Sequence, residues 1–157
     1  MTLARDIMET SVISVGMEDS VMGTCRLFYE EEISGAPVVS DDGMVVGVVS
    51  LTDLVRTAQE EHARLLTGPD YYRDAQTELR PEWQTEIEEF EDGLSRSRVS
   101  EVMTREVVSV APDVELQSVV KTILEHRIHR VLVLDEKAEG GNLAGIITLF
   151  DLVRLLE

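Results

Sequence analysis

An internal repeat runs through this 157-residue chain. Asp6-Ile7-Met8 and the following Val12–Val15 return 95 positions later as Glu101-Val102-Met103 and Val107–Val110, with the spacing held without a gap. After a three-residue insertion, Gly47–Arg56 matches Gly145–Arg154 at an offset of 98. A repeat of this length indicates that one structural unit occurs twice, and every local pattern has to be interpreted within that unit.

Both copies predict the same order of elements. A short extended segment is followed by an amphipathic helix, two apolar strands joined by a polar turn, and a closing helix. In copy two, Leu116, Val119 and Ile123 recur at helical spacing, whereas 131–134 is a short apolar run rich in β-branched residues. Asp41-Asp42-Gly43 predicts a tight hairpin turn in copy one, and Glu139–Asn142 a longer one in copy two. The order β-α-β-β-α predicts an α+β fold.

The repeat divides the chain into three parts, with repeat 1 at residues 1–56, a connector at 57–98 and repeat 2 at 99–157. The connector is acidic and less apolar than the repeats, and Gly68-Pro69 and Arg80-Pro81 interrupt it. It therefore reads as an insert between two equivalent units.

Two helices are expected in the connector. Ala58–Leu66 extends the closing helix of copy one, and Glu82–Phe90 forms another, with Trp83, Ile87 and Phe90 near one face. Such helices would pack on the repeats or on a partner. The alternative is a solvated acidic linker held by a few aromatic side chains.

The charge and cysteine content narrow the classes of partner and compartment. The formal net charge is −17, from 31 acidic and 14 basic residues, so the field of the protein should repel nucleic-acid phosphates. No run approaches the roughly 20 apolar residues that cross a bilayer. The single cysteine, Cys25, excludes an internal disulfide and favours a reducing compartment. We expect a cytoplasmic protein with neither a nucleic acid nor a membrane as partner.

Three features give the repeat a family resemblance. Each copy opens at a methionine, Met8 or Met103; copy one contains the strand Gly35–Val39; and both copies close on glycine, two apolar residues, Ser or Thr, and Asp three residues later. The unit resembles the CBS (cystathionine β-synthase-type) domain family over Ala4–Arg56 and Val99–Glu157. Two such domains normally form a Bateman module.

The resemblance implies two sheets that face one another across a pseudo-twofold axis, with helices outside and two clefts between the repeats. It also implies a regulatory module that binds an adenine nucleotide, AMP, ADP or ATP, and passes a conformational change to a separate effector protein. A homodimer through exposed helical faces is expected on the same basis. No cofactor is required, although Mg²⁺ would compensate the charge of ATP.

The closing motif offers the polar groups that a nucleotide needs. Ser50 and Asp53 in copy one, and Thr148 and Asp151 in copy two, stand at the start of a helix, so both side chains of a pair can point into one cleft. In the family these positions contact ribose and phosphate. The alternative is purely structural, because Ser, Thr and Asp cap helices without any ligand. The glycine before each motif permits close backbone approach or a strand irregularity.

An adenine ring needs an apolar slot with backbone amides nearby. By resemblance, the residues that form it lie at the entry of the first strand and at the start of the second strand of each copy: Val12, Ile13, Ala36 and Pro37 in copy one, and Val107, Val108 and Val131 in copy two. Each of these is also an ordinary core position.

The segment 125–130 differs most between the copies. It carries His126, Arg127, His129 and Arg130, whereas copy one has three glutamates and a glycine at 30–35. His129-Arg130 is similar to the phosphate-contacting pair in the gamma subunit of AMP-activated protein kinase, and arginine suits phosphate because it is permanently charged and directional. The two sites are therefore expected to be inequivalent. The alternative has the arginines as exposed helix-end charges and His129 as a packed neutral ring.

Catalytic motifs are missing from the sequence. It contains no Ser-His-Asp spacing, zinc-type Cys/His cluster or P-loop, and three histidines with one cysteine do not suggest a metal site. An enzyme is not expected, and a small hydrolase or transferase is the least favoured reading. The stronger alternatives to an adenine-nucleotide sensor are a ligand-independent dimerisation or scaffolding module and a module that binds S-adenosylmethionine.

Overall fold

We describe the fold from a computed structural model, which defines the backbone of residues 1–66 and 82–157 and the side chains of 1–64 and 88–157. The breaks expected at Gly68-Pro69 and Arg80-Pro81 lie outside the described residues.

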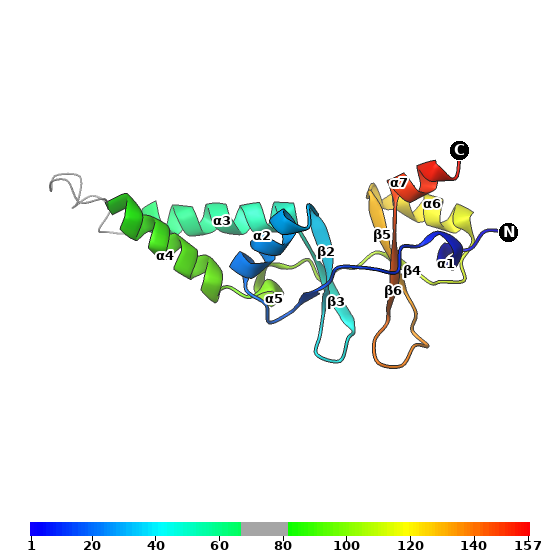
Figure 1. The fold of residues 1–157 in the computed structure, drawn as a ribbon, viewed down its shortest axis with the longest axis horizontal. Helices are drawn as coiled ribbons and strands as arrows, with labels where there is room; N and C mark the ends of the chain where they lie inside the picture. The colour runs from blue at the N-terminus through cyan, green and yellow to red at the C-terminus, as the bar shows by residue number, and fades with distance from the viewer. Residues whose placement is uncertain (67–81) are drawn as a thin grey trace. The chain divides into compact units, whose positions relative to one another are not determined.

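The first half of the described chain contains the elements of copy one (Figure 1). In order they are α1 (Ala4–Ile7), β1 (Val15–Gly16), α2 (Val21–Glu30), β2 (Gly35–Val39), β3 (Val45–Ser50) and α3 (Leu51–Leu66). The helix α3 continues without interruption from the closing helix of the repeat into the connector, over the range where a helical extension was expected.

The second half begins with the connector helix and continues through copy two. Its elements are α4 (Glu82–Arg96), α5 (Val99–Val102), β4 (Ser109–Val110), α6 (Leu116–His126), β5 (Arg130–Leu134), β6 (Leu143–Thr148) and α7 (Leu149–Arg154). The predicted α+β class and the β-α-β-β-α order of each copy are confirmed. The short helices α1 and α5 were not predicted, and only two residues of each opening segment are in a strand.

Each copy supplies one three-stranded sheet, with the order β1-β2-β3 in copy one and β4-β5-β6 in copy two. The opening strand is parallel to the next: Val15 lies opposite Val38, and Ser109 opposite Leu132. Strands β5 and β6 are antiparallel, with Arg130 opposite Thr148. This register places the start of β5 beside the end of β6, where α7 begins.

The chain folds into two compact units that cut across the sequence repeats. The first unit comprises residues 1–16, 36–48 and 104–157, and the second comprises 17–35 and 49–103. The opening helix of copy one therefore lies in the unit that holds most of copy two. The opening helix of copy two lies with the helices of copy one.

The core of the first unit is built mainly from β-branched side chains of copy two. Its fully buried members are Ala4, Val119, Ile123, Val131, Val133 and Ile147. Ala4 is the contribution of α1, and its amide donates to the carbonyl of Val114 over 2.9 Å. A second attachment follows at Glu9, which forms an antiparallel bridge with Ile146 of β6. The opening segment of copy one thus completes the core and the sheet edge of copy two.

The tips of the two β-hairpins also meet in the first unit. Gly43, at φ +78°, ends the turn predicted at 41–43, and a Cβ there would lie 2.9 Å from the carbonyl oxygen of Gly140. The side chain of Asn142 accepts a hydrogen bond from the Val45 amide at 2.9 Å. The positive-φ glycines therefore allow the turns to touch as well as to form.

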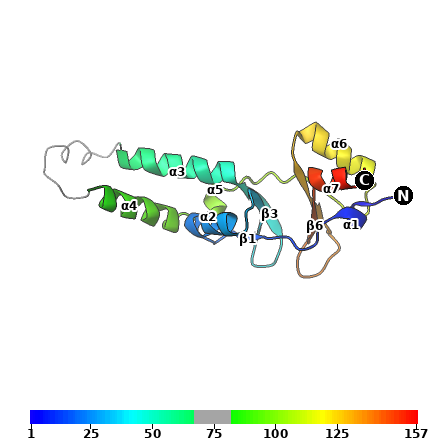
Figure 2. The same cartoon turned by 45° about the horizontal axis from the view of Figure 1, so that its top comes forward.

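The second unit is helical, and Figures 1 and 2 both show α3 and α4 running alongside one another. Helices α2, α3 and α4 pack together, and their buried side chains include Val21, Phe28, Leu54 and Leu94. The helix α4 occupies the range expected for a second connector helix. Trp83 and Ile87 lie on α4, but their side chains are outside the described residues; that of Phe90 is half-buried.

Candidate functional site

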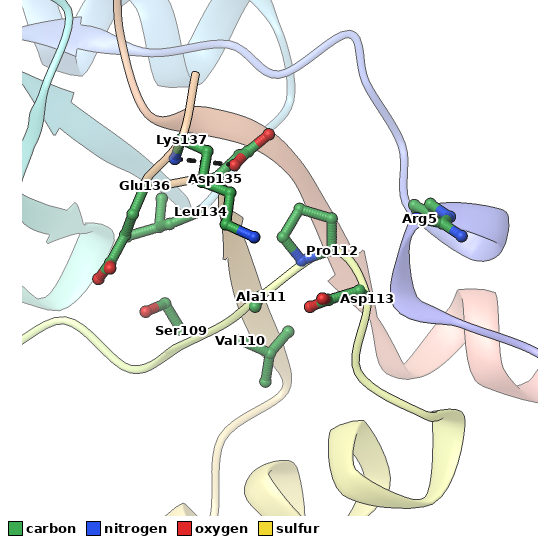
Figure 3. A pocket seen from close by; sticks show the side chains of 10 residues that line it. All are labelled: Arg5, Ser109, Val110, Ala111, Pro112, Asp113, Leu134, Asp135, Glu136 and Lys137. Carbon is green, nitrogen blue, oxygen red and sulfur yellow. Dashed lines mark hydrogen bonds between the residues drawn. The ribbon is translucent and has the colours of Figure 1, made fainter. Parts of the chain in front are cut away.

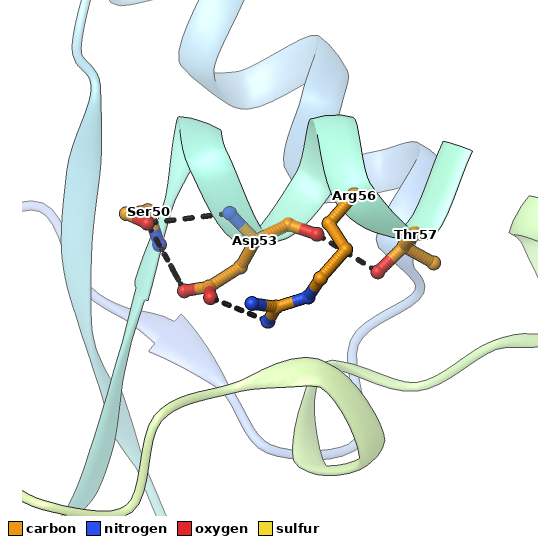
Figure 4. Close-up of polar contacts among 4 residues, drawn as sticks. All are labelled: Ser50, Asp53, Arg56 and Thr57. Carbon is orange, nitrogen blue, oxygen red and sulfur yellow. Dashed lines mark hydrogen bonds and ion pairs between the residues drawn. The ribbon is translucent and has the colours of Figure 1, made fainter. Parts of the chain in front are cut away.

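The closing motif of copy one is a self-contained polar network at the start of α3 (Figure 4). One carboxylate oxygen of Asp53, Oδ2, accepts from the Ser50 amide at 2.9 Å and from the Ser50 hydroxyl at 3.1 Å. The other, Oδ1, accepts from the Arg56 guanidinium at 2.9 Å. Asp53 is only 5% exposed. Both oxygens therefore already have partners within the helix.

The closing motif of copy two has the same cap and a different outer contact. Asp151 Oδ2 accepts from the Thr148 amide at 2.8 Å and from the Thr148 hydroxyl at 2.9 Å, as in copy one. Arg154, the counterpart of Arg56, instead lies over the Phe150 ring, 5.8 Å from its centre. Within the described residues, Asp151 Oδ1 accepts no hydrogen bond. The structural capping role holds in both copies, but only copy two leaves a carboxylate oxygen available.

The cationic pair of copy two lies at the end of the sheet where α7 begins. Arg130 is directly opposite Thr148 in the β5–β6 ladder, and the carbonyl of His129 accepts from the Leu149 amide at 3.0 Å. Both side chains are exposed. The sheet register thus brings the predicted phosphate-binding pair to the same end of the sheet as the predicted ribose-binding aspartate. His129 is not a packed core ring.

Arg127 stands at the C-terminal end of α6 in a left-handed conformation, with φ 52°. Its side chain is exposed, as expected of a charge that favours the carbonyl end of a helix. The equivalent residue in copy one, Glu32, has φ 54°. Arg127 therefore has a sufficient structural role at the helix end, whereas Arg130 is paired in the ladder with Thr148 of the closing motif.

The residues expected around an adenine are more buried than the polar ones. Val131 is 1% exposed and belongs to the core of the first unit, Val108 packs against that core, and Val107 is half-buried. In copy one, Ala36 and Pro37 are buried, and Val12 and Ile13 are half-buried. The side chain of Val131 is thus occupied by packing, and a base at this end of the sheet would meet backbone and half-buried side chains.

The predicted nucleotide-binding residues are distributed unequally between the two compact units. All of the copy-two set lies in the first unit: Val107, Val108, His129, Arg130, Val131, Thr148 and Asp151. Of the copy-one set, Val12, Ile13, Ala36 and Pro37 lie in the first unit, and Ser50 and Asp53 in the second. The structure therefore assembles the copy-two set within one compact body.

Gly145 shows the close backbone approach expected of the glycine before the motif. A Cβ at this position would lie 2.8 Å from the carbonyl oxygen of Glu9 and 2.8 Å from the side chain of Met8. The neighbour that requires glycine is the opening segment of copy one. Gly145 therefore allows the opening segment of copy one to pack against β6 of copy two. Sequence reasoning did not identify this role.

Sequence reasoning also did not identify the contact between Phe150 and Arg154. The signal was present in the repeat, because Thr52 of copy one aligns with Phe150 of copy two, four residues before Arg154. An aromatic ring and an arginine at this helical spacing are neighbours on one face.

A pocket of about 530 Å³ lies along β4 and at the end of β5 that is opposite Arg130 (Figure 3). Arg5 and Lys137 provide cations there, and three carboxylates accompany them. The full lining is Arg5, Ser109, Val110, Ala111, Pro112, Asp113, Leu134, Asp135, Glu136 and Lys137. None of the predicted nucleotide-binding residues is among them. Its mixed charge does not indicate a ligand class.

Other chemistries find little support in the described residues. No group of three His, Cys, Asp or Glu side chains gathers there as a metal site would require. Cys25 is half-buried on α2, and desolvation raises the pKa of its thiol, which disfavours a nucleophilic thiolate. None of the helices described is both long and apolar enough to cross a membrane.

Comparison with known proteins places the repeats in a family. The family model for the CBS domain matches residues 4–60 and again residues 99–157. Over 161 aligned residues the chain is 34% identical to protein MJ1426 of Methanocaldococcus jannaschii, which covers 98% of this chain and 90% of that relative. Four other curated relatives are longer, and the chain spans only 21% to 42% of the length of these four.

Solved structures share the fold. The CBS domain pair of protein MJ0100, determined with 5′-methylthioadenosine and S-adenosyl-L-methionine, has a TM-score of 0.65 and 20% identity, covering 99% of this chain and 100% of that one. The structure of CBSX2 in complex with AMP has a TM-score of 0.70 and 24% identity, covering 99% and 96%.

Proposed function

This chain belongs to the CBS domain family as a tandem pair, and we propose that it is a regulatory module that binds an adenine nucleotide and changes conformation in response. The observation that carries the proposal is the arrangement at the end of the copy-two sheet. Asp151 has one carboxylate oxygen available, and Arg130 pairs across the β5–β6 ladder with Thr148, the residue that caps the helix of Asp151. Neighbours with this fold bind adenosyl ligands, namely AMP in CBSX2 and S-adenosyl-L-methionine in MJ0100.

The chemistry of the site suits a nucleoside phosphate. An ionised carboxylate accepts hydrogen bonds from the two hydroxyls of a ribose, and arginine donates directionally to phosphate oxygens. The half-buried Val107 and Val108 offer apolar contact for a base. Such a site requires no metal or other cofactor for binding. Mg²⁺ would accompany only the ligand with most phosphates, ATP.

The charge of the protein favours ligands with fewer phosphates. With a net charge of −17, the protein as a whole repels a ligand more strongly with each added phosphate. We therefore rank AMP and ADP above ATP. S-adenosylmethionine carries a cationic sulfonium and no phosphate, so it would use Asp151 without needing Arg130, which makes it the principal alternative ligand.

Signalling would work by a shift in population. A ligand that binds one arrangement of the two repeats more tightly than another stabilises that arrangement by its difference in affinity. The output would pass to a separate effector protein. A single cysteine without a disulfide suits a reducing compartment, and we place this function in the cytoplasm.

A homodimer is part of the proposal, because apolar side chains are exposed at equivalent positions of both copies. The pairs are Tyr29 with Leu124, Leu51 with Leu149, and Val55 with Val153, and all six are more than one-third exposed. Recurrence at matched positions favours an interface over chance exposure. A dimer that forms without any ligand is also what the scaffolding alternative requires.

The test is thermal unfolding with AMP, ADP, ATP and S-adenosylmethionine in parallel. At 100 times its dissociation constant, a ligand that binds only the native state stabilises it by about 2.7 kcal/mol, which raises the melting temperature by about 5–10 °C. We expect AMP or ADP to give this rise, and we expect Arg130→Ala and Asp151→Ala each to reduce it.

Lys137→Ala provides the matched control, since it removes a cation at the other end of the same sheet. The response to AMP should survive this substitution. If none of the four ligands raises the melting temperature, the scaffolding alternative replaces the sensor. A rise that Lys137→Ala abolishes and Asp151→Ala does not would move the ligand to the pocket of Figure 3.

A further inference from the structure

The first six residues of the two closing helices differ at one position, and this position determines which side chain the arginine contacts. Both contain Asp at the third helical position and Arg three residues later, Asp53 with Arg56 and Asp151 with Arg154. Between the cap and the aspartate, copy one has Thr52 and copy two has Phe150.

In copy one the arginine turns toward the aspartate. The Arg56 guanidinium donates to Asp53 Oδ1 at 2.9 Å, while Oδ2 is held by Ser50. The aspartate side chain is 7% exposed and that of the arginine 56% exposed, so the cation covers a nearly buried anion (Figure 4). A ribose hydroxyl that approaches Oδ1 has to compete with Arg56 for this oxygen.

In copy two the arginine turns away from the aspartate. Arg154 lies over the Phe150 ring, one helical turn earlier on the same face, and it makes no ion pair with Asp151. Phe150 is 70% exposed, so the ring is accessible to the Arg154 guanidinium. Thr52 offers no ring, and Arg56 has no equivalent alternative.

We propose that Phe150 is a positioning residue: by holding Arg154 on its ring it keeps Asp151 open to ligand, whereas Arg56 blocks Asp53, so that the copy-two site fills first. This inference rests on the proposed function, because it names which aspartate receives the ribose. It also gives the predicted inequivalence of the two sites a physical cause.

The size of the effect follows from the strength of such an ion pair. Partly exposed pairs contribute little to stability, so displacing Arg56 should weaken binding at copy one by about 2- to 5-fold and leave a second, weaker site detectable.

The placement of the arginines can be tested without a ligand. One double-mutant cycle, with melting temperature as the readout, combines Asp53→Asn and Arg56→Met, and a second combines Asp151→Asn and Arg154→Met. Asparagine is used because it preserves the helix cap in both copies. We expect a coupling of about 1–4 °C for the copy-one pair and none for the copy-two pair. In a Phe150→Thr background the copy-two coupling should appear, and in Phe150→Tyr, which keeps a ring, it should stay absent.

The consequence for binding is tested with AMP, one site at a time. In Asp151→Ala, where only copy one retains its aspartate, Arg56→Met should tighten AMP binding about 2- to 5-fold. In Asp53→Ala, Phe150→Thr should weaken AMP binding by a similar factor, Phe150→Tyr should not, and adding Arg154→Met to Phe150→Thr should restore it.

Two results would overturn the inference. One is equal coupling in the two wild-type pairs, and the other is weaker AMP binding in Arg56→Met, which would make Arg56 a ligand contact. If the chain binds no AMP at all, the proposed function fails, while the ligand-free cycles still decide whether Phe150 positions Arg154.

Discussion

Glu32 holds a backbone conformation that glycine adopts more easily. It follows α2 with φ 54°, and the Ile33 amide donates back to the Phe28 carbonyl at 3.0 Å, which is the hydrogen bond of a Schellman helix end. At this position a side chain has a steric cost, and a negative charge is unfavourable near the carbonyl end of a helix.

Replacing Glu32 by glycine should therefore stabilise the protein. We expect a gain of about 1 kcal/mol, or a rise of about 2–4 °C in melting temperature, from relief of the left-handed backbone and removal of the charge. Glu31→Gly is the matched control, because it removes the same charge at a residue with φ −92°. It should gain less or lose stability. Equal gains from both variants would attribute the effect to charge alone.

The closing motif shows which roles of single residues can be predicted from the sequence and which cannot. Ser50, Thr148 and the two aspartates could be recognised as caps from spacing alone, since a cap needs only a neighbouring amide. The contact of Arg56 with a carboxylate and that of Arg154 with an aromatic ring could not be predicted from this spacing, because they depend on one further residue of the helix. Val131 illustrates the same limit, since an apolar residue at a strand start can either line a site or fill the core.

At the scale of elements, the packing of the opening segment of copy one against β6 depends on Gly145. Replacing it by alanine would place a Cβ 2.8 Å from the Glu9 carbonyl oxygen and from the Met8 side chain. The opening segment should then detach from β6, at a cost of about 1–3 kcal/mol from overpacking. Hydrogen exchange should report it directly, with faster exchange at the Glu9 and Ile146 amides, which are paired in the native bridge. Unchanged exchange at both amides would refute this role.

The contact between the two hairpins depends on Asn142. Its side chain accepts from the Val45 amide at 2.9 Å, so Asn142→Ala should leave a partly buried donor without a partner and cost about 1 kcal/mol. Asn142→Asp keeps the acceptor oxygen and should retain most of the stability. A chemical denaturation series on the three proteins measures the difference, and an equal loss in both variants would show that the acceptor is not what matters.

Elements within a copy were predictable because their signals are local. The apolar spacing of α6 and the β-branched run of β5 identify both elements from a few consecutive residues. The helix α1 has four residues, too few for a periodic signal, and its burial of Ala4 against copy two is a non-local contact. No pattern near the N-terminus indicates which copy the opening segment joins.

At the scale of the whole molecule, the exposed apolar positions predict a dimer. Replacing Val55 and Val153 together by glutamate should introduce charge at matched positions of both closing helices and leave the buried cores intact. Light scattering should then report a monomer where the wild type is a dimer. Replacing the exposed Ser118 and Gln117 by glutamate serves as the control for added charge. A wild-type chain that is monomeric at all concentrations would contradict the dimer.

The decisive measurement is an equilibrium titration of the purified chain with AMP by calorimetry, on the wild type and on Asp151→Ala. We predict saturable binding in the wild type, with the tighter site lost in Asp151→Ala because the open carboxylate oxygen is gone. Wild-type binding that is absent, or that Asp151→Ala leaves unchanged, would contradict a nucleotide site at the end of the copy-two sheet.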